Sequence, residues 1–483
     1  MSKILFIASE AAPLAKTGGL ADVVGALPHA LAELGHQVEV MIPFYRRSVV
    51  QAGVEVHQTD RVISIWIAGS LRHCPIHRAR IGGVDFLLVE QDDLYDRAAL
   101  YGEGGGAYGD NLLRFMVLDR VALEWAAGAD APFDLLHCHD WQSGLVPLLL
   151  TRQYRHRPAL AHTRTIFTIH NLAYQGVFAG TGVVEMGLPI EDFHPEGYEF
   201  YHQINCMKAG VLAADWVTTV SPSYAAEILT AEYGCQLEGF LRRFSDKLSG
   251  VVNGLDMVSW NPATDPHTAA NFAAGHATGK KRCKRALQES SGLASDDATP
   301  LLVTISRLAD QKGIDLLVDA APLWFARGVE LVVLGSGDAW LEERLRQLEG
   351  AYPKQCRFYQ GFNEPLARQI YAGADFFVMP SRFEPCGLGQ LMAMRYGAIP
   401  IVRATGGLID TVIDVADDGQ RATGFHFADA SSAALAQAGV AAIEYRQASR
   451  AAFSRMIGRA LRRDSSWRAS AVRYSEIYGQ LGA

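Results

Sequence analysis

The fold class is decided by residues 4–42, which read ILFIASEAAPLAKTGGLADVVGALPHALAELGHQVEVMI. This stretch opens with the apolar run 4–8 and closes with a second apolar run at residues 38–42. Between the two runs, a pair of glycines precedes apolar residues that recur at helical spacing from Leu20 onward. A strand, a glycine turn, an amphipathic helix and a second strand are typical of a parallel βαβ unit, so the stretch predicts an α/β fold.

The same alternation continues along the chain. Further strands are predicted at residues 86–89, 135–138, 165–169, 217–220, 301–305, 331–334, 376–379 and 399–402. Because these runs are continuously apolar and helical stretches separate them, they favour parallel sheets covered on both faces. The expected architecture is two Rossmann-like doubly wound domains facing a central cleft.

The pattern restarts near residue 251, which sets the expected domain boundaries. We expect a first domain over residues 1–250 and a second over residues 251–460. The remaining segment, residues 461–483, carries an amphipathic helix at residues 467–481, which we expect to pack back on the first domain.

Composition narrows the function classes. The chain has 483 residues, 49% of them hydrophobic and 20% charged, with a net charge of −8, so neither disorder nor a general affinity for nucleic acid is expected. Its seven cysteines include no C-x-x-C pair, which disfavours a zinc site or a disulfide framework. The N-terminal apolar run is too short for a signal peptide, and no run approaches a membrane span. We therefore expect a cytoplasmic protein without a membrane partner.

Two loops place cations where a strand gives way to a helix. Lys16 precedes Gly18 and Gly19, and a helix that starts there offers free N–H groups to a phosphate. Arg307 and Lys312 follow the predicted strand 301–305 and are suited to a diphosphate. The alternative interpretation is a tight turn with a solvated lysine in the first case, and a pair of surface charges in the second.

A third loop, residues 382–390, reads RFEPCGLGQ and follows the predicted strand 376–379. Glu384 can accept hydrogen bonds from sugar hydroxyls, and the glycine amides of this loop can bind phosphate oxygens. We interpret Cys386 as a buried structural thiol rather than a nucleophile, because no Cys–His pair is evident.

Histidines and an aspartate end two strands of the first domain. His137, His139 and Asp140 occur in HCHDW at residues 137–141, and His170 occurs in TIHN at residues 168–171. The His-x-His spacing suits a metal, but alternate residues of a strand share one face, so packed histidines are the favoured interpretation. His170 can donate to a sugar or phosphate oxygen, although a lone histidine is more often structural.

Together these motifs resemble the bacterial glycogen synthase and plant starch synthase family. The resemblance runs from about residue 4 to residue 478. Its matching stretches, in order, are KTGGLAD (16–22), YGDNLLRF (108–115), HDWQSGL (139–145), TIHNLAYQG (168–176), VSPSYA (220–225), VNGLD (252–256), SRLADQKG (306–313), SRFEPCGL (381–388) and TGGLIDT (405–411).

The resemblance implies transfer of glucose from a nucleotide diphosphate, favoured as ADP-glucose, to the non-reducing 4-hydroxyl of an α-1,4-glucan, with retention of configuration. It implies catalytic roles for Glu384, His170, Lys312 and Arg307. The implied donor-binding residues are Lys16, Gly18, Gly19, Asp22, Asn253, Ser306, Cys386, Gly387 and Leu388. The implied cleft and acceptor residues are Asp140, Trp141, Asn171 and Tyr95. Neither a metal nor pyridoxal phosphate is expected, and the oligomeric state stays open.

Three positions depart from related patterns. Gln142 stands where the family usually has histidine, which puts any protonation role there in doubt. Gln236 replaces a usual glycine. Met392 occupies the place where related retaining transferases often carry a second glutamate, and this absence is typical of the glycogen synthase branch.

Several alternatives remain open at this stage. They are a UDP-glucose-dependent transferase of the same fold, a phosphorylase, a transferase that makes a small product such as sucrose, and a non-catalytic glucan-binding homologue. For the chemistry, a double displacement needs a carboxylate nucleophile, and none is identifiable. We therefore expect attack on the same face of the sugar from which the phosphate departs.

Overall fold

The computed structural model describes residues 1–104, 106–276 and 278–482. The chain folds into two compact units. Unit 1 comprises Met1–Gly254 together with the C-terminal residues from Trp467 on, and unit 2 comprises Leu255–Ser466. The predicted boundaries fall after residues 250 and 460, whereas the units divide after Gly254 and Ser466.

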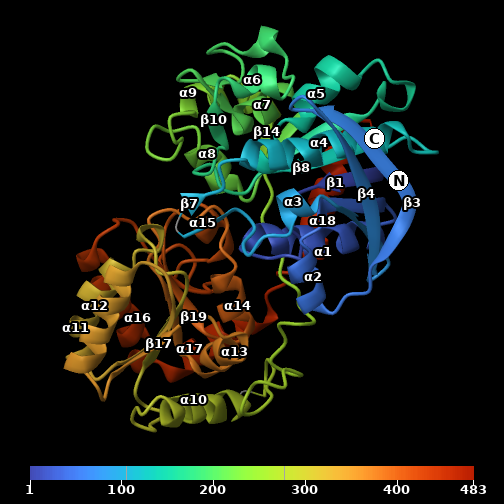
Figure 1. The fold of residues 1–483 in the computed structure, drawn as a ribbon. Coiled ribbons are helices and arrows are strands. Elements are labelled where there is room, and N and C mark those ends of the chain that lie inside the picture. Colours follow the sequence, from blue (N-terminus) through green and yellow to red (C-terminus); the bar gives the residue numbers. More distant parts are fainter. Residues whose placement is uncertain (105, 277, 483) are drawn as a thin grey trace. The chain divides into compact units, whose positions relative to one another are not determined.

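Unit 1 is built on a nine-stranded sheet. In spatial order its strands are β14 (Leu248–Gly250), β13 (Trp216–Thr219), β9 (Arg164–Ile169), β8 (Leu135–His139), β1 (Lys3–Ile7), β2 (Gln37–Pro43), β5 (Val84–Val89), β4 (Ser70–Ile81) and β3 (His57–Ile67). The strands from β14 to β5 pair in parallel, and the long hairpin β3–β4 adds antiparallel strands at one edge (Figure 1).

Helices and smaller strands complete unit 1. The longer helices are α1 (Gly19–Glu33), α2 (Arg46–Ala52), α4 (Asn111–Ala127), α7 (Cys206–Ala213) and α18 (Trp467–Gln480). The short helices are α3 (Asp92–Tyr95), α5 (Val146–Leu149), α6 (Gly182–Glu185), α8 (Pro222–Glu227) and α9 (Glu238–Arg242), with single turns η1 (Trp141–Ser143), η2 (Leu150–Tyr154), η3 (Pro158–Leu160), η4 (Ile190–Asp192) and η5 (Ser245–Lys247). The remaining strands are β6 (Gly102–Glu103), β7 (Gly106–Ala107), β10 (Val177–Ala179), β11 (Glu199–Phe200) and β12 (Gln203–Asn205).

The C-terminal helix α18 belongs to the core of unit 1. Trp467, Tyr474 and Tyr478 are buried in the same apolar cluster as the β1 residues Ile4 and Phe6, and α18 packs against α1. The Tyr478 hydroxyl also lies 2.9 Å from Nδ1 of His137 on β8. The helix is therefore fixed by both apolar packing and a buried hydrogen bond.

Unit 2 is built on a six-stranded parallel sheet. Its strands, in spatial order, are β17 (Cys356–Gln360), β16 (Glu330–Gly335), β15 (Leu301–Ile305), β18 (Phe376–Met379), β19 (Ile399–Arg403) and β20 (Phe425–Phe427). Its helices are α10 (Thr278–Ser290), η6 (Asp310–Lys312), α11 (Ile314–Phe325), α12 (Ala339–Ala351), α13 (Glu364–Gly373), α14 (Gly389–Arg395), α15 (Gly407–Thr411), α16 (Ser432–Ala448) and α17 (Arg450–Arg462).

The α/β fold class and the strands predicted from the sequence are confirmed, and no strand end differs by more than two residues. The hairpin β3–β4 was missed by the sequence analysis, and it makes the sheet of unit 1 mixed rather than wholly parallel. Its strands alternate exposed and buried residues, for example exposed Trp66 between buried Ile65 and Ile67, so they lack the continuous apolar run of a doubly covered strand.

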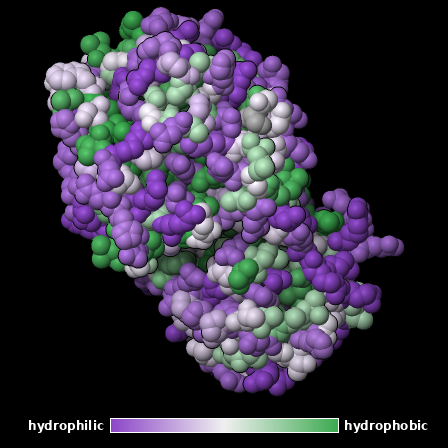
Figure 2. Space-filling view, turned by 90° about the vertical axis from the view of Figure 1, so that its right-hand side faces the viewer, coloured by the Kyte–Doolittle hydropathy of each residue, from purple (hydrophilic) through white to green (hydrophobic). Residues whose placement is uncertain are grey.

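Exposed large apolar residues occur in both units, for example Trp66 and Phe362. Figure 2 shows one face on which hydrophilic residues predominate and apolar residues occur in small groups. Within residues 1–104, 106–276 and 278–482, no helix combines the length and the apolar character needed to cross a membrane.

One departure from the family pattern has a visible backbone consequence. Gln236 has φ +68° and follows Cys235, which has φ +49°, so two consecutive non-glycine residues adopt the left-handed region. Both side chains are exposed, and each left-handed residue costs roughly 1 kcal/mol for an L-amino acid. The glycine usual at this position would avoid that cost.

We predict that Gln236→Gly stabilises unit 1. The relief of left-handed strain outweighs the extra entropy of glycine in the unfolded chain, and the expected gain is about 0.5–1 kcal/mol in the free energy of unfolding. Gln236→Ala is the matched control, because it removes the amide and keeps the strained backbone. Urea unfolding measures both, and equal stability of the two variants would contradict the strain argument.

Candidate functional site

The site residues predicted for unit 1 follow parallel strands that lie side by side. β1 pairs with β8, and β8 pairs with β9, so the carboxyl ends of these strands share one edge of the sheet. The residues at that edge are Glu10 and the Lys16–Gly19 loop after β1, His139 and Asp140 at the end of β8, and His170 and Asn171 after β9.

The loop before α1 is open to a ligand. Lys16 Nζ lies 2.6 Å from Asp22 Oδ1, and about half of the lysine side chain is exposed. A Cβ atom added to Gly18 or Gly19 would meet nothing within 4 Å. The chain itself therefore gives no steric reason for glycine here, whereas close approach of a ligand to the backbone would supply one.

A buried carboxylate holds this loop in place. Glu10, only 3% exposed, accepts hydrogen bonds from the backbone N–H and the hydroxyl of Thr17, and from the Tyr101 hydroxyl at 2.8 Å. Burial raises the pKa of Glu10, and these hydrogen bonds partly offset the rise. The sequence analysis missed Glu10, although a carboxylate directly after the first strand was the available signal.

Tyr95 needs a correction. The structure buries it completely, and its hydroxyl donates to the Arg114 carbonyl oxygen at 2.6 Å. It is therefore a core residue rather than an acceptor-binding one. The tyrosine that does approach the loop is Tyr101, through its hydrogen bond to Glu10.

Asp140 adopts a strained backbone at the end of β8. Its φ of +56° and ψ of −175° lie in a region that is nearly exclusive to glycine. Its N–H donates to the Thr168 carbonyl oxygen at 2.9 Å, and its Oδ1 accepts the His170 N–H at 2.7 Å. Burial raises the pKa of Asp140 to about 7, against the opposing effect of hydrogen bonds from the N–H groups of His170 and Asn171. Strain that is held in this way is typical of functional sites.

His170 lies against a second histidine. Its Nε2 is 3.0 Å from Nδ1 of His139. Burial lowers the pKa of His170 to about 3 and that of His139 well below its ordinary value. His170 is 9% exposed and His139 is not exposed at all. Both rings are therefore neutral at neutral pH, and of the two only His170 reaches the surface.

Both ring nitrogens of His137 form hydrogen bonds within unit 1. Its Nδ1 lies 2.9 Å from the Tyr478 hydroxyl, and its Nε2 lies 2.7 Å from the Thr168 hydroxyl. Because both ring nitrogens are used, the His-x-His pair is packed and hydrogen-bonded. This agrees with the favoured interpretation of the sequence rather than with a metal site.

The contacts of the remaining unit 1 residues do not by themselves assign a role. Trp141 packs against Phe115 and Phe178, with ring centroids 5.0 and 5.6 Å away. The Oδ1 of Asn253 is buried and has no hydrogen-bond partner among the described residues, and the same holds for Oε1 of Gln142. Asn171 uses its Oδ1 to accept the Ala173 N–H.

In unit 2, Lys312 and Glu384 meet although 72 residues separate them. The lysine Nζ lies 2.6 Å from Glu384 Oε2, which also accepts a hydrogen bond from the Ser381 hydroxyl at 2.9 Å. The side chain of Glu384 is 7% exposed and that of Lys312 is 15% exposed. No described residue bonds to Oε1 of Glu384, so one oxygen stays available to a ligand.

Arg307 differs from the other cations. It is exposed after β15, and its guanidinium forms no ion pair or hydrogen bond with any described residue. Ser306, beside it, donates to the Arg307 carbonyl oxygen. Arg382, in contrast, is bound in a bidentate manner by Asp315.

The loop after Glu384 is fixed by close contacts. Cys386 is 4% exposed, in keeping with a buried thiol. Gly387 has φ +74°, and a Cβ there would lie 2.5 Å from Oε1 of Gln390, which donates from its Nε2 to the Cys386 and Gly387 carbonyl oxygens. Leu388 is half-buried just before α14.

The buried carboxylates at the carboxyl edges of the two sheets each contact another group of the chain. Glu10 holds the loop, Asp140 holds the backbone after β9, and Glu384 holds Lys312.

Elsewhere in unit 2, Asp414, Asp417 and His426 bring their possible metal-ligating atoms within 4.8 Å of one another. This is the one such group among the described residues. It does not coincide with the predicted site.

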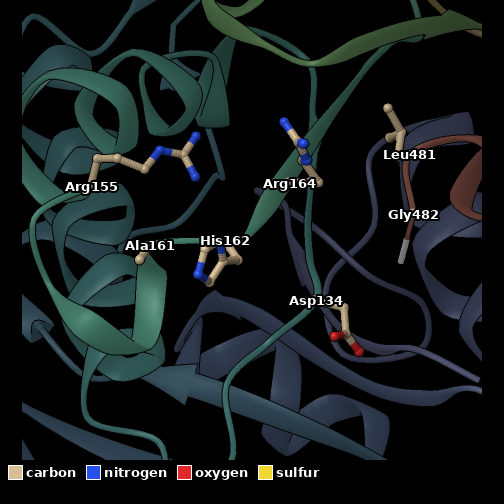
Figure 3. Close-up of a pocket in the computed structure, with 7 residues that line it drawn as sticks. All are labelled: Asp134, Arg155, Ala161, His162, Arg164, Leu481 and Gly482. Atoms are coloured by element: carbon tan, nitrogen blue, oxygen red, sulfur yellow. The ribbon is translucent and has the colours of Figure 1, made fainter.

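A cavity of about 500 Å³ opens at the opposite edge of the unit 1 sheet. It is lined by Asp134, which precedes β8, and by Arg164, the first residue of β9 (Figure 3). Arg164 pairs with Asp215, and Arg155 donates to the carbonyl oxygens of Leu160 and Thr163. Because its charges are satisfied and it lies at the amino ends of the strands, it is not the predicted site.

We predict that Asp140→Asn changes how the stability of unit 1 depends on pH. Between about pH 4 and pH 7 the folded chain holds a proton on Asp140 that the unfolded chain has released, so stability falls as pH rises through this window. Asparagine does not titrate and keeps an acceptor for the His170 N–H. Its advantage over the wild type should therefore grow from pH 4 to pH 7 and then level off.

Urea unfolding midpoints at a series of pH values measure this difference. The buried neutral histidines add their own pH dependence below about pH 6.5, but they are common to both proteins and cancel in the comparison. A difference that stays constant across the series would contradict a raised pKa for Asp140.

Comparison with known proteins places this geometry in a family. The model of the starch synthase catalytic domain matches residues 3–243, and the model of group 1 glycosyl transferases matches residues 299–444. Glycogen synthase 2 of Geobacter metallireducens is 44% identical over 477 residues, covering 99% of this chain and 98% of that protein. Glycogen synthase of Anaeromyxobacter dehalogenans is 44% identical over 488 residues, covering 99% of each.

Solved structures agree. The catalytic domain of starch synthase IV from Arabidopsis thaliana, bound to ADP and acarbose, is 34% identical with a TM-score of 0.91 and covers 99% of both chains. A sucrose-phosphate synthase from Thermosynechococcus elongatus shares the fold, at 19% identity, with a TM-score of 0.59 over 100% of this chain and 99% of that one. The chain belongs to the glycogen and starch synthase family and is a glycosyltransferase of the GT-B fold.

Proposed function

We propose that the protein transfers glucose from ADP-glucose to the non-reducing 4-hydroxyl of an α-1,4-glucan, with retention of configuration. One observation carries the proposal: the carboxyl edge of unit 2 holds a buried glutamate, its lysine partner and an arginine, and no described residue pairs with that arginine or bonds to the second glutamate oxygen. The relatives named glycogen synthase, and the starch synthase bound to ADP and acarbose, support the choice of substrates.

The cations suit the leaving diphosphate. Negative charge grows on the phosphate oxygen as the sugar departs, and fixed donors stabilise that charge without reorganisation. Arg307 and Lys312 would bind the diphosphate in unit 2. In unit 1, Lys16 and the N–H groups of Gly18 and Gly19 offer phosphate oxygens the same kind of donors. No step of this scheme draws on a metal ion or a prosthetic group.

Glu384 would hold the donor glucose. Its Oε2 is occupied by Lys312 and Ser381, which leaves Oε1 to accept a hydrogen bond from a sugar hydroxyl. His170, Asp140 and Asn171 would contact the sugars from the edge of unit 1, with Trp141 as an apolar surface beside them.

We propose same-face attack for the retaining step. The acceptor 4-oxygen forms its bond to the anomeric carbon on the face where the bond to phosphate breaks, and its proton passes to the departing phosphate oxygen. The hydrogen bonds of Glu10 and Asp140 to the chain, and the assignment of Glu384 Oε1 to a sugar hydroxyl, support this route over a carboxylate nucleophile. A trapped covalent glucosyl–enzyme adduct would overturn it.

We also propose a cytoplasmic location. The seven cysteines are free, and six of them are buried, which suits a reducing compartment.

The primary test is release of nucleoside diphosphate. The purified protein is incubated with glycogen and either ADP-glucose or UDP-glucose, in the presence of a chelator. We expect ADP release that depends on glycogen. A preference for UDP-glucose would change the donor assignment, and no release with either donor would favour a non-catalytic glucan-binding protein.

Arg307→Ala tests the diphosphate site more cleanly than a change at Lys312. Loss of Lys312 would leave a buried Glu384 charge without its partner. Arg307 is exposed and forms no ion pair with a described residue, so its removal should leave folding intact. One charged hydrogen bond is worth about 1.5–3 kcal/mol, so kcat/KM for the donor should fall roughly 10- to 100-fold.

Arg282→Ala is the matched control, since Arg282 is an exposed arginine of α10 without an ion pair among the described residues. Steady-state kinetics at varied donor concentration measure both variants. Equal kcat/KM for the two would remove Arg307 from the donor site.

A further inference from the structure

His139 is a buried histidine that the proposed mechanism does not use. It is the last residue of β8 and is not exposed. Its ring stacks on that of His137, at 4.3 Å and 24°, and on that of Phe6, at 5.1 Å and 28°. A substrate cannot reach it, so any effect on the reaction must act through a neighbour.

That neighbour is His170, because Nδ1 of His139 lies 3.0 Å from its Nε2. Burial lowers the pKa of both rings far enough that each carries a single proton at neutral pH. A hydrogen bond between two neutral imidazoles needs one N–H and one bare nitrogen. Two arrangements are therefore possible, and they differ in which nitrogen of His170 carries the proton.

The other nitrogen of His139 decides between the two arrangements. Its Nε2 is buried without a hydrogen-bond partner among the described residues, and His137 cannot serve it because both His137 nitrogens are taken by Tyr478 and Thr168. A buried N–H without an acceptor is among the rarest groups in folded proteins. The proton of His139 therefore lies on Nδ1, where it is donated to His170.

We propose that His139 is a positioning residue that fixes His170 as its Nδ1–H tautomer. With Nε2 of His170 accepting from His139, Nδ1 is the nitrogen left for a ligand, and no described residue bonds to it. Thus His170 meets the ligand as a neutral N–H donor, suited to a sugar hydroxyl or a phosphate oxygen. The catalytic consequence rests on the proposed glucosyl transfer, whereas the tautomer itself does not.

The backbone around both histidines reinforces this assignment. The His170 N–H donates to Asp140, and the His139 N–H and carbonyl oxygen both bond to the Ser143 hydroxyl, at 2.6 and 2.9 Å. The main chain of each residue is thus held independently of its ring. A change of the His139 ring should therefore alter the proton on His170 more than it alters the position of the loop.

The direct test is a long-range ¹H–¹⁵N correlation spectrum of the full-length protein with ¹⁵N-labelled histidine at neutral pH. Such a spectrum distinguishes a protonated ring nitrogen from a bare one, and the His170 signals are identified by their loss in His170→Asn. We expect His170 to carry its proton on Nδ1. A proton on Nε2 would overturn the proposal whatever the activity of the protein.

Two substitutions separate donation from packing. His139→Asn keeps an N–H donor near the position of Nδ1 and loses the stacked ring, whereas His139→Phe keeps the ring and loses the donor. If His139 acts by donation, His139→Phe should lower kcat about tenfold and redistribute the His170 tautomers, and His139→Asn should retain most of kcat. The opposite order of the two variants would show that the ring serves only packing.

The controls distinguish a failure of the tautomer assignment from a failure of the proposed glucosyl transfer. Thermal unfolding of both variants checks that they are folded, and the wild-type spectrum decides the tautomer even if neither variant folds. A wild-type protein that is inactive with every donor but carries the Nδ1 proton would contradict the proposed function alone. An active wild type with the Nε2 proton would contradict this inference alone.

Discussion

The parallel pairing of β8 with β9 is the constraint on which the unit 1 site depends. Its register sets His139 opposite Thr168, so the residues that follow each strand emerge next to one another. Asp140 can then bind the His170 N–H, and His139 can reach the His170 ring. A slip of one residue would turn every side chain to the other face of the sheet and separate these groups.

Burial shifts the pKa values of the titratable groups in this arrangement toward their neutral forms. Three neighbouring buried histidines of unit 1, His137, His139 and His170, have lowered pKa values, and Asp140 has a raised one. The histidines are therefore neutral, and what matters for a ligand is which ring nitrogen carries the proton. Two hydrogen bonds hold the strained backbone of Asp140: its N–H donates to Thr168, and its side chain accepts the His170 N–H. The backbone therefore cannot relax without releasing His170.

The sequence alone predicted the strands that are continuously apolar and therefore the edge to which Asp140, His170, Arg307 and Glu384 belong. It missed the hairpin β3–β4, because one face of each strand is exposed and its pattern alternates. It also missed the bond between Glu10 and Tyr101, which are 91 residues apart and linked only by the fold. Tyr95 was misassigned for the same reason, since nothing local distinguishes a buried tyrosine from one that reaches a ligand.

The cations of the two units show how an acidic chain can hold an anion. Lys16 is paired with Asp22, and Lys312 with Glu384, whereas Arg307 is unpaired among the described residues. An ammonium has three N–H donors, so a single carboxylate partner leaves donors for phosphate oxygens. Each pairing also orders a long side chain before the ligand arrives, which lowers the entropy lost on binding. Under the proposed function, the paired lysines would therefore supply geometry, and Arg307 would supply net positive charge for a diphosphate.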